Sequence, residues 1–537
     1  MRTQILRRTL QRLAATTAIA ALGAAAPVGA QTLTASTRQA IQTPPPAQQT
    51  APASQGPVVQ LSIEQAVDMA LETSLGLKSD RLTVDIASQN IASAKSAFVP
   101  TVTAGFSGNT TQRQPTDFTQ GSSDISSHNM GGTGSFDQQL PWFGNRYHVG
   151  WNASRITQIG GNATFNPQLG STLSFNITQP LWRNFMIDQP RGNVLSTEIN
   201  RQISDVNLQS RVVSLEANVR NAYLSYVGAI KGQEVAQQNM DIAQESLRAA
   251  RARVAVGVGA PIEVIQAQAV AASFEDQLIS ANSLISTAED NLRSLILDHD
   301  RPDYWQVKLE PTSTILLTER PVDVNEVIKA ALANRLDSQV MRQQMQVTDL
   351  NLRVNENLTR PSLDFSVSYI ATGTGGTQLS YGQGFPPPIL SSTGRSFSSA
   401  LGDAFLGSYP NWTFGLVLGY PIGKSGAEAA VAQNQLQKRQ QELALQQLET
   451  EIVREVREAV RQVQTAYQRV HASEAAMQAT EQQLDAAQRR FEVGLASSFE
   501  VQQNQRDLAS ARQNNLQAKI NYNRALISLN AVQKIPQ

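Results

Sequence analysis

The chain has 537 residues, and its 44 Lys and Arg residues are balanced by 44 Asp and Glu residues. This balance excludes strongly basic nucleic-acid-binding proteins and acidic tail proteins, and a hydrophobic content of 41% predicts an ordered chain. Because Cys is absent, disulfides, Cys-ligated zinc, thiol catalysis and a lipid anchor on an N-terminal Cys are excluded. The four His residues are scattered, which disfavours a His-based metal site. We therefore expect neither a metal nor another cofactor.

Residues 1–30 have the pattern of a secretory signal peptide. Four Arg residues precede an apolar stretch over 13–26, and small residues suited to a signal peptidase end at Ala30. Cleavage there would leave a mature chain with a net charge near −4, since four Arg and no acidic residue are removed. The alternative is a retained membrane anchor. Residues 31–59, rich in Pro and Gln, are expected to form an extended linker.

The sequence contains an internal repeat. Segment 61–100 matches segment 322–361 at a constant offset of 261 residues, and both end in Pro. The order helix, strand, polar loop, strand, very long helix, short turn and helix also recurs. We interpret the chain as repeat 1 over 60–297 and repeat 2 over 322–537, joined by a linker over 298–321.

Alternation of apolar with small or polar residues predicts two strands in each repeat. They lie within the strand regions 101–184 and 361–421, and their lengths suit tilted strands that cross a bilayer. A soluble β-sandwich has the same alternation. Of the 31 aromatic residues, 21 lie in 101–188 and 361–420, as aromatic girdles at the two membrane surfaces would require. No window after the signal peptide has about 18 consecutive apolar residues, so any membrane crossing has to use strands.

The strand regions contain two further segments with patterns of their own. The sequence Pro141-Trp142-Phe143-Gly144 indicates an extra hairpin over 134–157, whose place is left open. Residues 373–408 are rich in Gly, Ser and Pro, and we expect an extracellular surface loop there. A disordered interdomain linker is the alternative.

Long helical patterns follow the second strand of each repeat. Residues 190–256 and 424–492 have few Pro or Gly residues and many Ala, Gln, Leu, Arg and Glu residues. At about 1.5 Å per residue, each helix would be roughly 100 Å long, which exceeds the width of a globular core.

The remaining helices are about half as long. Returning helices are expected over 261–297 and 498–532, and helices before the first strands over 63–98 and 324–358. Each returning helix is expected to stack end to end with a preceding helix along the long one. The expected fold class is mainly α, with a helical tube below a membrane β-barrel. Four strands per chain cannot close a barrel, so the chain is expected to oligomerise, and three chains would supply twelve strands.

At this point the sequence resembles the TolC-like outer-membrane efflux proteins, the channel-tunnel family. The resemblance covers residues 61–532 and is most specific in the paired motifs Arg253-Val-Ala-Val-Gly257 and Arg490-Phe-Glu-Val-Gly494. It implies a homotrimer with one twelve-stranded outer-membrane barrel, continued by a periplasmic α-helical barrel with linker 298–321 outside it near its equator. It also implies an exit duct for a tripartite efflux or type I secretion system of a Gram-negative bacterium, with a periplasmic adaptor and an inner-membrane pump driven by protons or ATP as partners.

The resemblance also assigns roles to individual residues. It implies that the adaptor docks on two tip turns, and the alternative is a plain helix-hairpin turn; the tip residues are Val256, Gly257, Val258, Val493, Gly494 and Leu495. It further implies a ring of carboxylates that narrows the periplasmic aperture and favours cations, and the alternative is ordinary acidic residues at helix starts; the aperture residues are Glu263, Gln266, Glu500 and Gln503. Ala496 and Gln503 depart from the family's polar latch, so closure is expected to rest on Phe491 and Phe499.

No catalytic motif accompanies these features. Gly423-Lys424-Ser425 lacks the preceding Gly of a phosphate-binding loop, because Leu418 stands at that position. We therefore expect no enzyme activity and no catalytic residue. The alternative to an export duct is a non-conducting envelope-spanning structural protein or adhesin. A duct lined by Ser, Thr, Asn and Gln has little chemical selectivity, so we expect the pump to select the exported substrate.

Overall fold

The computed structural model describes residues 58–116, 124–160, 163–313, 322–384, 387–420, 422–423 and 425–533. They belong to one compact unit, Gln55–Gln537. The expected signal peptide over 1–30 lies outside the described residues, as does the linker over 31–59 except for its last two residues.

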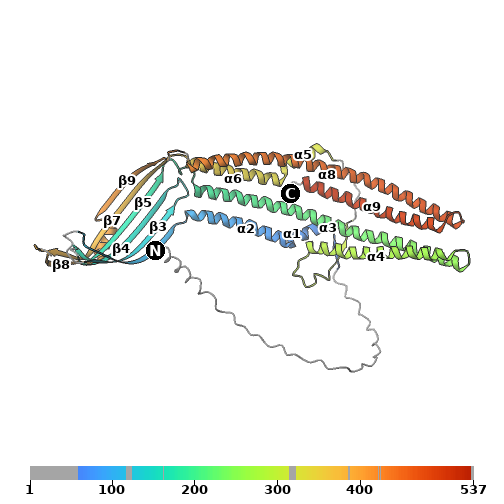
Figure 1. The fold of residues 1–537 in the computed structure, drawn as a ribbon, viewed down its shortest axis with the longest axis horizontal. Helices are drawn as coiled ribbons and strands as arrows, with labels where there is room; N and C mark the ends of the chain where they lie inside the picture. Colours follow the sequence, from blue (N-terminus) through green and yellow to red (C-terminus); the bar gives the residue numbers. More distant parts are fainter. Residues whose placement is uncertain are drawn as a thin grey trace, which may run out of the picture. The chain divides into compact units, whose positions relative to one another are not determined.

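A seven-stranded antiparallel sheet lies at one end of the described residues (Figure 1). The strands are β2 (Thr101–Arg113), β3 (Ile125–Gln139), β4 (Arg146–Ile159), β5 (Phe165–Pro180), β7 (Ser362–Tyr381), β8 (Ile389–Arg395) and β9 (Pro410–Gly419). Their order is β2-β3-β4-β5-β7, and β9 and β8 pair with the first and last parts of β7. The sheet is therefore six strands wide near the helices.

The expectation of four strands per chain is wrong. The additional strands β3 and β4 form a longer hairpin than the expected 134–157, and they lie in the sheet between β2 and β5. Gly131, Gly132 and Gly134 weaken the apolar alternation of β3. Backbone hydrogen bonds to two neighbouring strands nevertheless hold it in place, since a ladder does not depend on side chains.

The expectation of a loop over 373–408 is also wrong. This segment contains the end of β7, strand β8 and the helix α7 (Phe397–Leu406). A Cβ added to Gly373 would clash with the backbone oxygen of Ala400. The glycines that indicate a loop in the sequence therefore permit the close packing of a helix on a strand.

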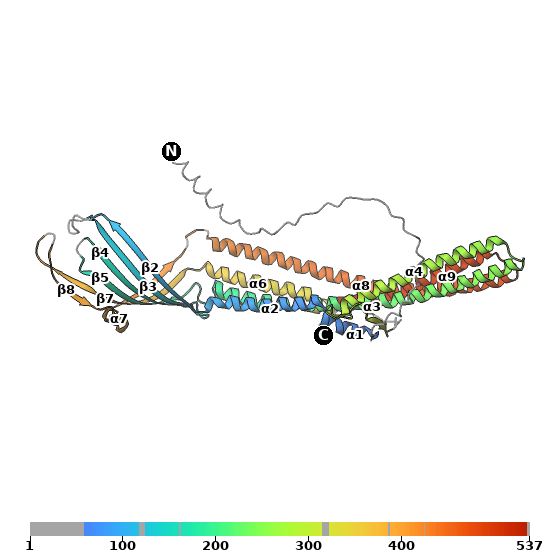
Figure 2. The same cartoon turned by 90° about the horizontal axis from the view of Figure 1, so that it is seen from below.

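The helices extend from the sheet in two sets (Figures 1 and 2). The first set comprises α1 (Ile63–Thr73), α2 (Leu75–Lys95), the 3₁₀ turn η1 (Ser96–Phe98), α3 (Gln189–Ala255) and α4 (Pro261–Ile296). The second comprises α5 (Val324–Asn334), α6 (Leu336–Leu358), α8 (Gly426–Glu492) and α9 (Ser498–Gln533). Helix α3 contacts α2 and α4, and α8 contacts α6 and α9. The shorter helices thus cover successive parts of each long one.

The helices expected over 63–98 and 324–358 are each broken. The first breaks at Ser74, whose hydroxyl accepts a hydrogen bond from Leu77 N and starts α2. The second breaks at Arg335, which has extended backbone angles between α5 and α6. Neither Ser74 nor Arg335 is Pro or Gly, so the residues that most often interrupt a helix are absent at both positions.

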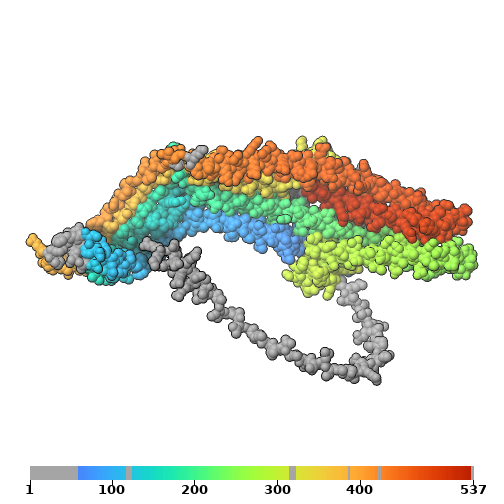
Figure 3. Space-filling model, viewed as in Figure 1, coloured from blue at the N-terminus to red at the C-terminus, as the bar shows by residue number. Residues whose placement is uncertain are grey.

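Two large clusters of buried side chains lie along the helices. One joins α1, α3 and α4 to the segment after α4, and the other joins α5, α8 and α9. The space-filling view shows the first-half helices, blue to green, beside the second-half helices, orange to red (Figure 3). Within the linker 298–321, strand β6 (Lys308–Pro311) pairs in parallel with β1 (Val58–Leu61). This small sheet fastens the start of the described chain to the middle of the molecule.

Tyrosines of α3 hold this small sheet. Tyr223 donates to Leu61 O at 2.8 Å, and Tyr226 donates to Leu309 O at 2.6 Å. Burial, reinforced by the nearby Glu289 carboxylate, raises the pKa of Tyr226 to about 12. The protonated phenol is therefore the form that the folded protein favours.

Replacing Tyr226 with Phe is expected to lower stability by about 1–2 kcal/mol at neutral pH, because the buried carbonyl of Leu309 loses its donor. The folded pKa lies above the ordinary value of 10. This contribution is therefore fully present below pH 10 and is lost as the pH rises towards 12. Thermal unfolding of both proteins between pH 9 and 12, followed by circular dichroism, checks the result. A constant difference in Tm across this range would contradict it.

Candidate functional site

The two faces of the sheet differ in chemistry. Residues directly opposite each other in an antiparallel pair point to the same face, so the registers assign every strand residue to a face. On one face, Tyr369 of β7 lies opposite Phe175 of β5 and Trp412 of β9. On the other face, Ser368 lies opposite Asn176 and Thr413. The sheet therefore has an apolar, aromatic-rich face and a polar face.

The edges of this sheet are open. Among the described residues, β2 pairs only with β3 and β9 pairs only with β7. All residues of β2 are exposed, including Val102 and Phe106. Strand β9 likewise exposes Trp412, Phe414 and Leu416. Such edges require a partner strand, above all in lipid, where no water satisfies the free backbone groups.

The two predicted tip turns lie at the end of the helices remote from the sheet (Figure 2). One joins α3 to α4 and the other joins α8 to α9. Gly257 has φ +78° and Gly494 has φ +77°. The left-handed conformation lets Val258 N reach Arg253 O at 3.0 Å and Leu495 N reach Arg490 O at 2.7 Å. Each helix end is thus capped by its own backbone, which leaves the neighbouring side chains free for other contacts.

The apolar side chains beside these glycines point into solvent. Val256, Val258, Val493 and Leu495 have exposed fractions between 69% and 74%. Exposure of four large apolar side chains at two adjacent turns is unusual for a solvated hairpin and typical of a contact surface.

The four predicted aperture residues lie in the first two turns of α4 and α9. Glu263 Oε1 accepts a long hydrogen bond of 3.5 Å from Ala260 N, and its other carboxylate oxygen is buried. Glu500 forms an ion pair with Arg490 at 3.0 Å across its own turn. Gln503 donates to Asp507 at 3.0 Å, and Gln266 is half-buried. Within one chain, the structure therefore gives both Glu residues a local role at a helix start.

Sequence reasoning missed the part that Arg residues play at these tips. Arg490 neutralises part of the Glu500 charge, and its counterpart Arg253 lies over the ring of Phe491 at 4.3 Å. Both Arg residues belong to the repeated motif, and that recurrence was the available signal. Phe491 is half-buried beside Val501 and Leu508, whereas Phe499 is exposed. A groove of about 590 Å³ separates the two hairpins near their tips.

No other kind of site stands out in the part of the chain that the structure describes. It places no group of three or more His, Asp or Glu side chains where they could hold a metal ion. None of the described helices is both long and apolar enough to cross a membrane.

Comparisons with known proteins agree with this geometry. The family model described as outer membrane efflux protein matches residues 66–296 and 327–532. Similar solved structures include a membrane protein from Pseudomonas aeruginosa, with 16% identity and a TM-score of 0.62 over 88% of this chain and 93% of that one. The CmeC outer membrane channel of Campylobacter jejuni has 16% identity and a TM-score of 0.61 over 88% and 85% of the two chains.

A third such structure is the outer membrane protein VceC of Vibrio cholerae, with 16% identity and a TM-score of 0.60 over 88% of this chain and 95% of that one. None of the curated proteins matches this chain in sequence. The solved structures share its fold at low identity, and the family model spans more than half of its residues. The resemblance inferred from the sequence is thereby confirmed, and the chain belongs to the outer membrane efflux protein family.

Proposed function

We propose that this protein is the outer-membrane channel of a tripartite efflux or type I secretion system. It acts as a passive exit duct, and an inner-membrane pump driven by protons or ATP supplies the energy. Two features found together support this proposal. The sheet has one apolar face and two open edges, and the helix hairpins are built on α3 and α8, which have 67 residues each. A closed channel wall explains the sheet, and a long tube explains the helices.

The assembly we propose is a homotrimer that shares one barrel in the outer membrane of a Gram-negative bacterium. The helices would form a tube in the periplasm. The signal peptide would direct export of the chain, which would carry no lipid anchor on Cys. Equal helix lengths support two repeats per chain, since α4 and α9 both have 36 residues and α1 and α5 both have 11. Two similar units per chain give three chains six similar units around the tube.

The adaptor is proposed to dock on the two tip turns, Val256–Val258 and Val493–Leu495. Their glycine-capped backbones and exposed apolar side chains support this role. Glu263 and Glu500, with Gln266 and Gln503, are proposed to line the aperture beside the tips. The ion pair with Arg490 would reduce the field of a Glu500 ring without removing its charge. No step of this function needs a catalytic residue or a cofactor.

Single-channel recording in planar bilayers tests the function and the aperture separately. Wild-type protein is expected to form cation-selective pores. Glu500→Ala and Glu263→Ala are expected to reduce that selectivity, because each removes three carboxylates from a narrow ring. If wild-type protein conducts and neither variant differs from it, the duct stands and the aperture assignment falls. If folded trimers form no pore, the non-conducting structural protein is the better description.

A further inference from the structure

We propose that the β3–β4 hairpin is part of the membrane wall, so that three chains close an eighteen-stranded barrel instead of the expected twelve-stranded one. This inference rests on the proposed trimeric duct. It assigns a specific contact as well, in which β2 of one copy pairs with β9 of the next. The argument uses the chemistry of the hairpin's faces, its anchoring, and the direction of its strands.

The hairpin continues both faces of the sheet in register. One row of directly paired residues crosses all six strands on the apolar face: Val102, Phe136, Val149, Phe175, Tyr369 and Trp412. The adjacent row on the polar face is Thr101, Asp137, His148, Asn176, Ser368 and Thr413. In these two rows, strands β3 and β4 therefore place apolar residues on the apolar face and polar residues on the polar face, as the neighbouring strands do. A hairpin projecting into water would have no need for this match.

Contacts on each face agree with this division. On the apolar face, the rings of Phe136 and Tyr147 stack with centroids 5.8 Å apart. Tyr369 of β7 and Trp412 of β9 form a second aromatic pair on the same face, with centroids 4.6 Å apart. On the polar face, Asp137 and His148 lie 2.6 Å apart between Oδ1 and Nδ1. The hairpin thus supplies aromatic groups to the lipid side and hydrogen-bonding groups to the lumen side.

The hairpin's turn is fastened at the junction of sheet and helices. Gln179, at the end of β5, donates to Phe143 O at 2.9 Å and accepts from Asn145 at 3.1 Å. The Phe143 ring stacks on Phe185 with centroids 5.1 Å apart. Gln139 donates to Asp188, the N-cap of α3, at 3.0 Å. Strands β3 and β4 therefore reach the same level as the other strands and are fixed there.

The strand directions allow closure with a second copy. Neighbouring strands alternate in direction across the sheet, since every pair is antiparallel. Six strands are an even number, so β2 leaves the helices while β9 returns to them. A β2 strand beside the β9 strand of the next copy is then antiparallel as well. Two inserted strands preserve this alternation, whereas one would break it.

The eighteen-stranded barrel would be considerably wider than the twelve-stranded barrel that the family resemblance implies. Strands about 4.8 Å apart and tilted by about 40° give a backbone diameter of roughly 36 Å for eighteen strands and roughly 24 Å for twelve. The cross-section therefore grows about twofold. A barrel of this size leaves a broad aqueous lumen, so the tip aperture, and not the membrane wall, would limit the size of the cargo.

Engineered disulfides in the full chain test the strand order, and the absence of native Cys removes any background. Thr103 and Ser135 are directly paired, with hydroxyls 2.7 Å apart, and we expect Thr103→Cys with Ser135→Cys to cross-link within one chain. Thr103→Cys is then combined separately with Thr413→Cys, Gly415→Cys or Val417→Cys, three positions on the polar face of β9. We expect the combination that matches the register between β2 and the next copy's β9 to give covalent dimers and trimers.

In the alternative arrangement, the β3–β4 hairpin lies outside the membrane wall and β2 pairs directly with β5. An intrachain cross-link from Thr103→Cys to Asn176→Cys or Thr178→Cys, without one to Ser135→Cys, would overturn the eighteen-stranded wall and leave the duct intact. Counting strands by electron cryomicroscopy of the wild-type protein in lipid nanodiscs needs no variant: eighteen supports the proposal and twelve overturns it. A monomer by native mass spectrometry would refute the trimeric duct and this inference together.

Discussion

Leu495→Asp is expected to abolish export while the purified protein still forms pores. Leu495 is among the exposed apolar side chains of the tips, and its backbone N bonds to Arg490 O irrespective of the side chain. An adaptor that buries this position would have to bury an unpaired carboxylate, at a cost of about 3 kcal/mol or more. The affinity would fall roughly a hundredfold or more. Adding Val258→Asp in the other turn is expected to lower the affinity for the adaptor further.

Two readouts separate this effect from misfolding. Retention of the adaptor on the purified trimer, quantified by mass spectrometry, reports docking, and bilayer conductance reports an intact channel. Trp305→Asp is the matched control, because Trp305 is 73% exposed but lies in the linker between the repeats. Normal adaptor retention in Leu495→Asp would exclude the tips as the docking surface. Equal losses in Leu495→Asp and Trp305→Asp would indicate a general effect of added charge.

The sequence predicts the long helices and the outer strands well, because their periodicity is strong. Val102 and Phe106 alternate with small residues over the first half of β2, and Phe414 and Leu416 continue such an alternation through β9. Strand β3 offers no such signal. Its apolar face is partly built from Gly132 and Gly134, which lie opposite larger residues of β2 and β4. Pairing between strands, which sequence periodicity does not encode, determines its place.

At the tips, the sequence predicts the turns but not their electrostatics. Gly257 and Gly494 are identifiable because a left-handed residue ends each long helix. The pairing of Arg490 with Glu500 spans ten positions and depends on how the turn folds back. The stacking of Arg253 on Phe491 joins the two repeats, so it depends on how the hairpins pack. Contacts of this kind follow from tertiary structure and leave no spacing rule in the sequence.

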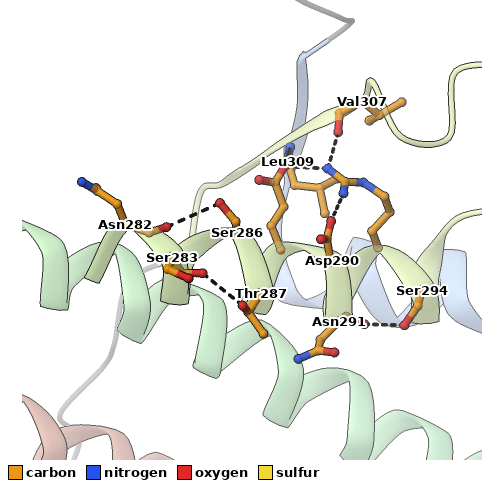
Figure 4. A network of polar contacts seen from close by, with 11 residues as sticks. Asn282, Ser283, Ser286, Thr287, Asp290, Asn291, Ser294, Val307 and Leu309 are labelled. Carbon is orange, nitrogen blue, oxygen red and sulfur yellow. Dashed lines mark hydrogen bonds and ion pairs between the residues drawn. The ribbon is translucent and has the colours of Figure 1, made fainter. Parts of the chain in front are cut away.

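Replacing Arg293 with Met is expected to open the small β1–β6 sheet. Arg293 is only 6% exposed and donates to Val307 O at 2.9 Å and to Glu289 at 3.0 Å, with Asp290 as a further partner. Figure 4 shows Asp290 on α4 beside Val307, with Leu309 nearby. Without the guanidinium, the largely buried Glu289 carboxylate loses its ion-pair partner. Removal of one partner of such a pair costs about 3–5 kcal/mol.

Hydrogen exchange at Leu309 gives a direct measure of this loss, since its amide donates to Glu289 Oε1 at 3.0 Å. A local opening that is easier by about 3 kcal/mol accelerates exchange roughly a hundredfold. Adding Glu289→Gln removes the charge of the carboxylate and retains an acceptor oxygen for Leu309 N. The double variant is therefore expected to recover most of the protection of Leu309 against hydrogen exchange. It should not recover all of it, because Val307 O still lacks its donor. Equal exchange in the single and double variants would show that the other lost contacts of Arg293, and not the buried carboxylate, weaken the sheet.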